Sequence, residues 1–201
     1  MFKQVFDPDN LLWRILARAV DFVGLSLATV FCCLPVVTMI PAIAALYYTI
    51  VKVFREKEDE AFKLFFRAFK NNLKDGIIVN LICLPFMAIF AAGYKVMLSA
   101  ADGGFGSMAF VIYYICLLIP AGWLVYICAV MGRFSQTKKE LFKTSFQLCI
   151  AHIPSTLIIV LLSLELCIWT IEKWTPCFIA PSLWAILSSL FFEKIFKKHI
   201  I

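Results

Sequence analysis

Charge is scarce in this sequence, and so are the residue patterns that carry chemistry. Asp, Glu, Lys and Arg together make up 16% of the 201 residues, against about a quarter in an ordinary globular domain. The eight cysteines form no CxxC pair and show no metal-ligand spacing with histidine. No HExxH, GxSxG or Walker motif occurs. We therefore expect a chain that is not an enzyme and has no metal site and no cofactor.

Hydrophobic residues dominate instead. They account for 63% of the sequence, and the mean hydropathy is +0.91. A soluble core of this size cannot hide so much apolar surface, whereas a bilayer accommodates it when each apolar run forms a helix. The runs are 22–51, 77–94, 110–131, 153–171 and 178–192. The sequence predicts an all-α polytopic integral membrane protein, a single transmembrane domain with five to six transmembrane helices.

The first run, residues 22–51, is long for one crossing and short for two, since about 20 residues span a bilayer core. Pro35 and Pro41 each remove a helical hydrogen bond. Thr38 is suited to cap a new helix with Pro41 in its first turn. A single kinked crossing and a broken hairpin both fit these residues. We favour the hairpin, because it places 17 of the 19 Lys and Arg residues on one side of the membrane.

Basic residues are unevenly distributed between the runs. Residues 52–76 contain seven Lys or Arg, whereas 95–108 and 172–177 contain one each. The positive-inside rule places 52–76 and the C-terminal tail, 193–201, in the cytoplasm. With the hairpin, the N-terminal segment 1–21 forms an interfacial helix on the same side.

Residues 61–74 predict a basic amphipathic helix. Its apolar residues fall on one face at helical spacing, and its basic residues fall on another. We favour a helix that lies on anionic headgroups; the alternative is a docking helix for a cytoplasmic protein, and nucleic acid is not expected because the basic face is short. The residues of this predicted surface are Phe62, Phe65, Phe66, Arg67, Phe69, Lys70, Leu73 and Lys74.

The second half of the chain resembles the first. Ile40-Pro41-Ala42 followed by Tyr47 matches Ile119-Pro120-Ala121 followed by Tyr126 at a constant offset. Each is followed by a basic, Phe-containing segment and then by another apolar run. This order predicts a parallel two-fold internal repeat; chance agreement within apolar sequence is the alternative.

Two ionisable residues adjoin or interrupt the apolar runs: Lys95 directly follows the run 77–94, and Glu165 lies within the run 153–171. Intramembrane charges are functional hypotheses by default. Counted along a helix, however, both lie near the outer interface. We therefore predict a structural ion pair between them and not a proton relay.

Three motifs in the first 75 residues, LPVVT, ALYY and FFRAFKNNLK, resemble the start of the YesL-like bacterial membrane proteins. The resemblance implies a family without established biochemistry, often encoded beside carbohydrate ABC importers and glycan-degrading enzymes. It also implies a multi-pass protein of the bacterial cytoplasmic membrane.

These observations lead to three functional hypotheses. The first is a non-enzymatic accessory protein that lies in the lipid bilayer and partners or stabilises permease subunits of a carbohydrate ABC importer. The second is a stand-alone small-solute transporter or channel built on the repeat. The third and weakest is a lipid-binding membrane protein, suggested by the basic amphipathic helices.

Overall fold

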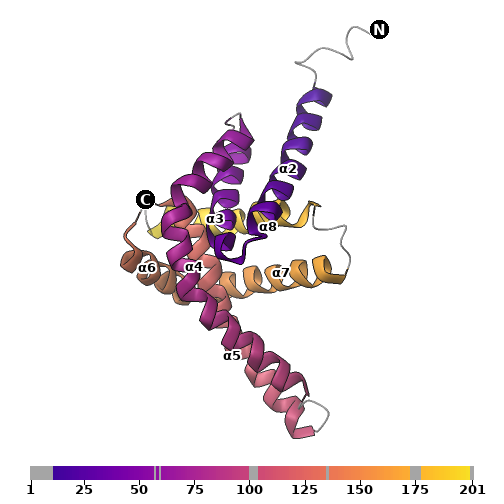
Figure 1. The fold of residues 1–201 in the computed structure, drawn as a ribbon, viewed down its shortest axis with the longest axis vertical. Helices are drawn as coiled ribbons and strands as arrows, with labels where there is room; N and C mark the ends of the chain where they lie inside the picture. Colours follow the sequence, from indigo (N-terminus) through magenta and orange to yellow (C-terminus); the bar gives the residue numbers. More distant parts are fainter. Residues whose placement is uncertain are drawn as a thin grey trace.

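The structure, a computed structural model, describes residues 11–56, 58, 60–99, 104–134, 136–172 and 178–199. Every regular element within these residues is helical (Figure 1), which confirms the predicted all-α class. The elements are α2 (Leu11–Cys33), a 3₁₀ turn η1 (Val36–Thr38), α3 (Met39–Ile50), a π-helical turn η2 (Val51–Arg55), α4 (Ala61–Ser99), α5 (Gly104–Arg133), α6 (Lys138–Ala151), α7 (Ile153–Glu172) and α8 (Ala180–His199).

The first apolar run folds as a hairpin of α2 and α3. Pro35 has an extended backbone (φ −74°, ψ 111°) and separates the two helices, while Pro41 lies in the first turn of α3, where its missing N–H costs little. Arg18, in the first half of α2, donates a hydrogen bond to the carbonyl of Val53, just beyond α3. The two helices therefore run antiparallel, and the predicted break is confirmed as a hairpin.

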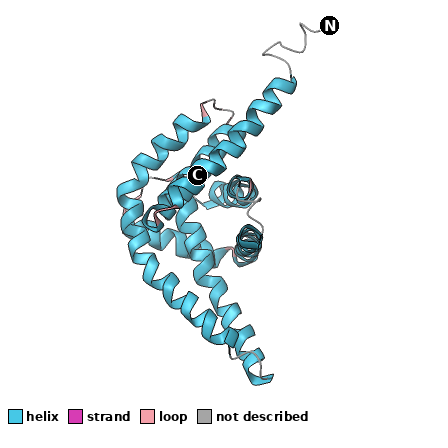
Figure 2. Cartoon of the chain, turned by 45° about the vertical axis from the view of Figure 1, so that its right-hand side comes forward, coloured by secondary structure: helices cyan, strands magenta, loops and turns pink. Residues whose placement is uncertain are grey.

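Two helices continue through boundaries that the sequence analysis had marked. α2 has no break near residue 21, between the predicted interfacial segment and the first span. α4 joins the basic segment to the predicted span 77–94 as one helix of 39 residues. It curves, so that its first turns and its second half point in different directions (Figure 2). Gly76 lies on the side of α4 that faces α3, where a Cβ would come within 2.7 Å of Pro41.

α3 is the central helix, with nine of its twelve residues buried. Small residues on α3 and α5 allow the two helices to approach closely. A Cβ on Gly132 of α5 would lie 2.5 Å from the carbonyl oxygen of Ala44 on α3. One apolar core joins α3 to α4, α5, α6, α7 and α8, and a second joins it to α2, α8 and the start of α4. Both cores therefore depend on α3.

The last three helices cross this bundle. α6 and α7 meet at His152 with a bend of 102°. α7 and α8 run crosswise to α3 (Figure 1), and Trp184 of α8 donates a hydrogen bond to Ser163 of α7 at 2.7 Å. In the predicted repeat, the curved helix α4 of the first half corresponds to the bent pair α6 and α7 of the second half.

The second half of α4 and the first half of α5 lie side by side and project from the other helices (Figures 1 and 2). We call residues 84–99 and 104–119 the α4–α5 arm. A Cβ on Gly93 would come within 2.5 Å of the Tyr113 hydroxyl, so the two helices of the arm pack closely.

Three stretches of the described residues are long and apolar enough to cross a membrane: Leu16–Cys33, Val36–Arg55 and Ile115–Arg133. A fourth is added if Lys138–Ala151 and Ile153–Leu166 form one broken span. The segment predicted as a crossing at 77–94 lies within α4, and the one at 178–192 lies within α8 except for its first two residues. The structure therefore agrees with a polytopic membrane protein, and the predicted total of five to six crossings stays a prediction.

Candidate functional site

A charged cluster joins the C-terminal ends of α3 and α5 to the second half of α8. Its centre is Glu193, whose side chain is 5% exposed. The Tyr47 hydroxyl of α3 donates a hydrogen bond to one carboxylate oxygen at 3.2 Å. A guanidinium nitrogen of Arg133, the last residue of α5, lies 3.6 Å from the other oxygen. The buried carboxylate is thus held by a hydroxyl and a cation from two different helices.

The cluster continues outward through the turn that follows α3. Arg133 also donates a hydrogen bond to Glu56 at 3.0 Å. Lys52 of the π-helical turn pairs with Glu56, and it lies 3.1 Å from a carboxylate oxygen of Glu58. Two cations and three carboxylates therefore alternate along one chain of contacts. We call Tyr47, Lys52, Glu56, Glu58, Arg133 and Glu193 the charged cluster.

Hydrogen bonds from Lys52 and then from Arg133 hold the pKa of the Glu56 carboxyl below its usual value. Burial acts in the opposite direction but is the smaller influence beside the Lys52 bond. Glu56 therefore stays ionised at neutral pH, and its charge balances the two cations that it bridges.

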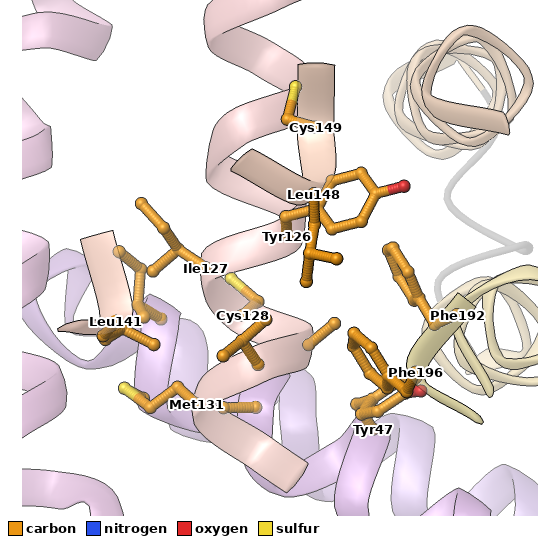
Figure 3. Close-up of a cluster of buried hydrophobic side chains, with 14 of the residues drawn as sticks. Tyr47, Tyr126, Ile127, Cys128, Met131, Leu141, Leu148, Cys149, Phe192 and Phe196 are labelled. Atoms are coloured by element: carbon orange, nitrogen blue, oxygen red, sulfur yellow. The ribbon is translucent and has the colours of Figure 1, made fainter. Parts of the chain in front are cut away.

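Aromatic side chains cover the inner side of the cluster. The Phe192 ring of α8 meets Tyr47 edge-on, with ring centroids 5.7 Å apart, and meets Tyr126 at 4.8 Å. Phe196 stacks one turn further along α8, 5.9 Å from Phe192. Figure 3 shows Phe192 and Phe196 facing the two tyrosines. Tyr47 and Tyr126 are the equivalent positions of the predicted repeat, and both are buried against one residue of α8.

This arrangement suits a structural connection between helices. Each carboxylate of the charged cluster has a cation or a hydroxyl within contact distance, and Glu193 is closed in by aromatic rings. Among the described residues no group of three or more His, Cys, Asp or Glu side chains is placed to hold a metal ion. The charges thus serve mainly to bind three helix ends to one another.

The charged cluster was not predicted from the sequence. Arg133 ends an apolar run, Glu193 opens the predicted basic tail, and Tyr47 lies inside the first apolar run. They are up to 146 residues apart along the chain. One feature of the sequence did point to it. Glu193 is an acidic residue between FF and KIFKK, in an otherwise apolar and basic segment, and a buried acidic side chain needs a partner.

The predicted amphipathic surface forms the first turns of α4, and its apolar residues do not share one environment. Phe65 is completely buried beneath α3, together with Ala61 and Ala68. Phe66 is 53% exposed, and Phe62 is also exposed. The basic residues of this surface, Arg67, Lys70 and Lys74, are exposed.

The residues predicted at the helix break meet a residue of α4. Thr38 occupies the position before α3, but its hydroxyl makes no capping hydrogen bond there. It donates to the carbonyls of Cys32 (2.6 Å) and Pro35 (2.8 Å) and so satisfies the end of α2. Asn80 of α4 is buried and donates to the Val36 carbonyl at 2.7 Å. The break is therefore fixed by hydrogen bonds from Thr38, within the break, and from Asn80 on α4.

The predicted ion pair between Lys95 and Glu165 receives no test here. Glu165 is exposed on α7, whereas the side chain of Lys95 lies outside the described residues. The pair stays a prediction.

Comparison with known proteins gives one match. Residues 9–94 match the model of a family described as "Protein of unknown function, DUF624". YesL-like proteins belong to this family, so the resemblance inferred from the sequence is confirmed over this part of the chain. No curated protein and no solved structure matches the chain.

Proposed function

From the DUF624 match over residues 9–94, we propose that this chain is a non-enzymatic accessory membrane protein that binds permease subunits of a carbohydrate ABC importer. The observation that carries the proposal is the α4–α5 arm, which presents apolar side chains away from both cores. Exposed apolar residues recur at helical spacing on each helix of the arm: Phe86, Ile89 and Val96 on α4, and Met108, Ile112, Ile115 and Ile119 on α5.

Two properties of the arm support a role in helix docking. Its helices already pack on each other through Gly93 and Tyr113, so a partner would meet a preformed pair. Its exposed stripe on α5, from Met108 to Ile119, follows the spacing i, i+4, i+7, i+11, which is the pattern of one continuous helix face. Lipid covers such a face in the absence of a partner.

The proposed orientation places the charged cluster on the cytoplasmic side of the bacterial membrane. The cluster and the basic residues that follow Glu193 on α8 lie where α3 and α5 end, as the ion pairs between α5, α8 and the turn after α3 indicate. The positive-inside rule then makes this end cytoplasmic. Cysteines placed at Lys70 and at Gly103 test it: only the second should react with an impermeant reagent in intact cells, and the reverse pattern would contradict the orientation.

Quantitative co-purification from native membranes in mild detergent tests the proposed function. Ile115→Trp places a bulky but lipid-compatible side chain on the arm, and Ile158→Trp does the same on an exposed position of α7. We expect the wild type and Ile158→Trp to recover permease subunits in a fixed ratio, and Ile115→Trp to lose them. Recovery that is unaffected by Ile115→Trp, or no recovery by the wild type, would contradict the proposal.

The transporter hypothesis takes support from the repeat-related positions of Tyr47 and Tyr126. Both meet at Phe192, which lies where the two halves join. The same rings fill this junction with packed aromatic side chains, which counts against a solute path there. The transporter is therefore the second candidate. Solute flux into proteoliposomes that contain the chain alone would favour it over the accessory role.

A further inference from the structure

The first turns of α4 carry an apolar stripe and a basic stripe. In the apolar stripe Phe62 and Phe66 are exposed, whereas Phe69 and Leu73 are half-buried. Lys63, Arg67, Lys70 and Lys74 repeat the same spacing one residue later. Because a helix turns by about 100° per residue, the basic stripe lies directly beside the Phe stripe. The opposite side of the helix is fixed against α3 by Phe65 and Ala68.

The basic stripe is only partly neutralised by the chain itself. Lys63, at its outer end, pairs with Glu60 at 2.8 Å. In the part of the chain that the structure describes, no carboxylate forms an ion pair with Arg67, Lys70 or Lys74. Asp75 follows Lys74 in sequence but pairs with Lys138 of α6 at 3.2 Å. Three adjacent cations next to the predicted span at 77–94 are thus left for an external anion.

We propose that this surface of α4 binds the anionic phospholipid headgroups of the membrane. The order of side chains around the helix favours lipid over an acidic protein. Passing around the helix, one meets the buried face with Phe65, then exposed Phe66, then the cations, which is the order from protein core to acyl chains to headgroups. The curve of α4 lets this segment lie at an angle to the arm (Figure 2).

The proposal is independent of the proposed partner, because it concerns the first turns of α4 and not the arm. It gives the two stripes different roles. Arg67, Lys70 and Lys74 provide selectivity for anionic lipid, which salt screens. Phe66 contributes apolar contact that is insensitive to lipid charge and to salt.

The test uses the full chain reconstituted in nanodiscs of phosphatidylcholine, with and without phosphatidylglycerol. Lipids that stay bound after gentle detergent extraction are quantified by mass spectrometry. Replacing the three unpaired cations by glutamine should reduce the preference for phosphatidylglycerol by up to about fivefold per cation removed. A matched triple variant removes three exposed cations elsewhere: Lys139→Gln, Lys143→Gln and Lys194→Gln.

The two triple variants carry the same net charge, so they separate a local surface from a general charge effect. A large loss of preference in the α4 variant and a small one in the control, both weakened by salt, supports the proposal. Equal losses in the two variants would overturn it. Unchanged lipid preference in the α4 variant would also overturn it. Loss of a co-purifying protein when the same variant is purified from native membranes would then assign the surface to a protein partner. Folding of each variant is checked by its elution as a single species.

Discussion

Replacing Glu193 with alanine removes the centre of the charged cluster. The Tyr47 hydroxyl loses the carboxylate that it contacts at 3.2 Å, and Arg133 loses one of its two carboxylate partners. Removing one member of a fully buried ion pair costs about 3–5 kcal/mol. Arg133 keeps Glu56 and its side chain is 21% exposed, so solvent screens part of this loss. We therefore expect a destabilisation of about 1–3 kcal/mol.

Conservative variants separate charge from packing at the same position. Glu193→Gln keeps the shape of the side chain and an oxygen that accepts from Tyr47, so its cost should be smaller, about 1 kcal/mol. Glu193→Met combined with Arg133→Met removes both charges and retains apolar volume, and it should be more stable than the sum of the two single changes predicts. The coupling between the two positions should be about 1–3 kcal/mol.

The assay is thermal unfolding of the detergent-purified chain, read as the fraction that remains a single species after heating. For a chain of this length about 1 kcal/mol corresponds to a shift in Tm of about 2–4 °C. Glu193→Ala should lower the Tm clearly, and the double methionine variant should recover part of the loss. A Glu193→Ala variant as stable as the wild type, or additive single changes, would refute a structural role for the cluster.

Three further predictions concern packing and pH. Phe65→Ala should destabilise the chain by about 3–5 kcal/mol, whereas Phe66→Ala, at a half-exposed position, should change the free energy of unfolding by less than about 0.5 kcal/mol; equal effects in the thermal assay would contradict the burial pattern. Gly132→Ala should cost about 1–3 kcal/mol, because its Cβ would lie 2.5 Å from a backbone oxygen of α3; an unchanged Tm would contradict this close approach. The lowered pKa of Glu56 means that its contribution to stability is present above the ordinary carboxyl pKa and is lost as the pH falls through the lowered value; the Tm difference between wild type and Glu56→Gln should vanish at acid pH, and a difference independent of pH would contradict it.

The parts of the fold that depend on local chemistry could be predicted from the sequence. Prolines cannot continue a helix interior but are tolerated in a first turn, and this predicted both the break at Pro35 and the start of α3 near Pro41. The charge distribution favoured the hairpin over a single kinked crossing, and the Arg18 contact to Val53 agrees with the hairpin. The role of Thr38 was harder to foresee, because its hydroxyl can bond to the preceding helix as well as to the following one.

Contacts between distant residues could not be predicted from the pattern alone. Phe65 and Phe66 are adjacent and chemically identical, yet one is buried and the other is exposed. The difference depends on where α3 crosses α4, which helical spacing does not specify. In the same way, Glu193 acquires its meaning only when α8 returns to the ends of α3 and α5. A single acidic residue in the predicted basic tail does not indicate which residue it pairs with.

Site-specific photo-crosslinking from the arm in living cells tests the proposed function most directly. A photoreactive amino acid at Ile115, which is 58% exposed on the arm, samples whatever covers this face in the native membrane. The same group at Ile158 of α7 serves as the matched exposed control. The account predicts an adduct between Ile115 and a permease subunit of a carbohydrate importer, with none from Ile158. Adducts of Ile115 with lipid or with a second copy of this chain, and none with a permease, would contradict it.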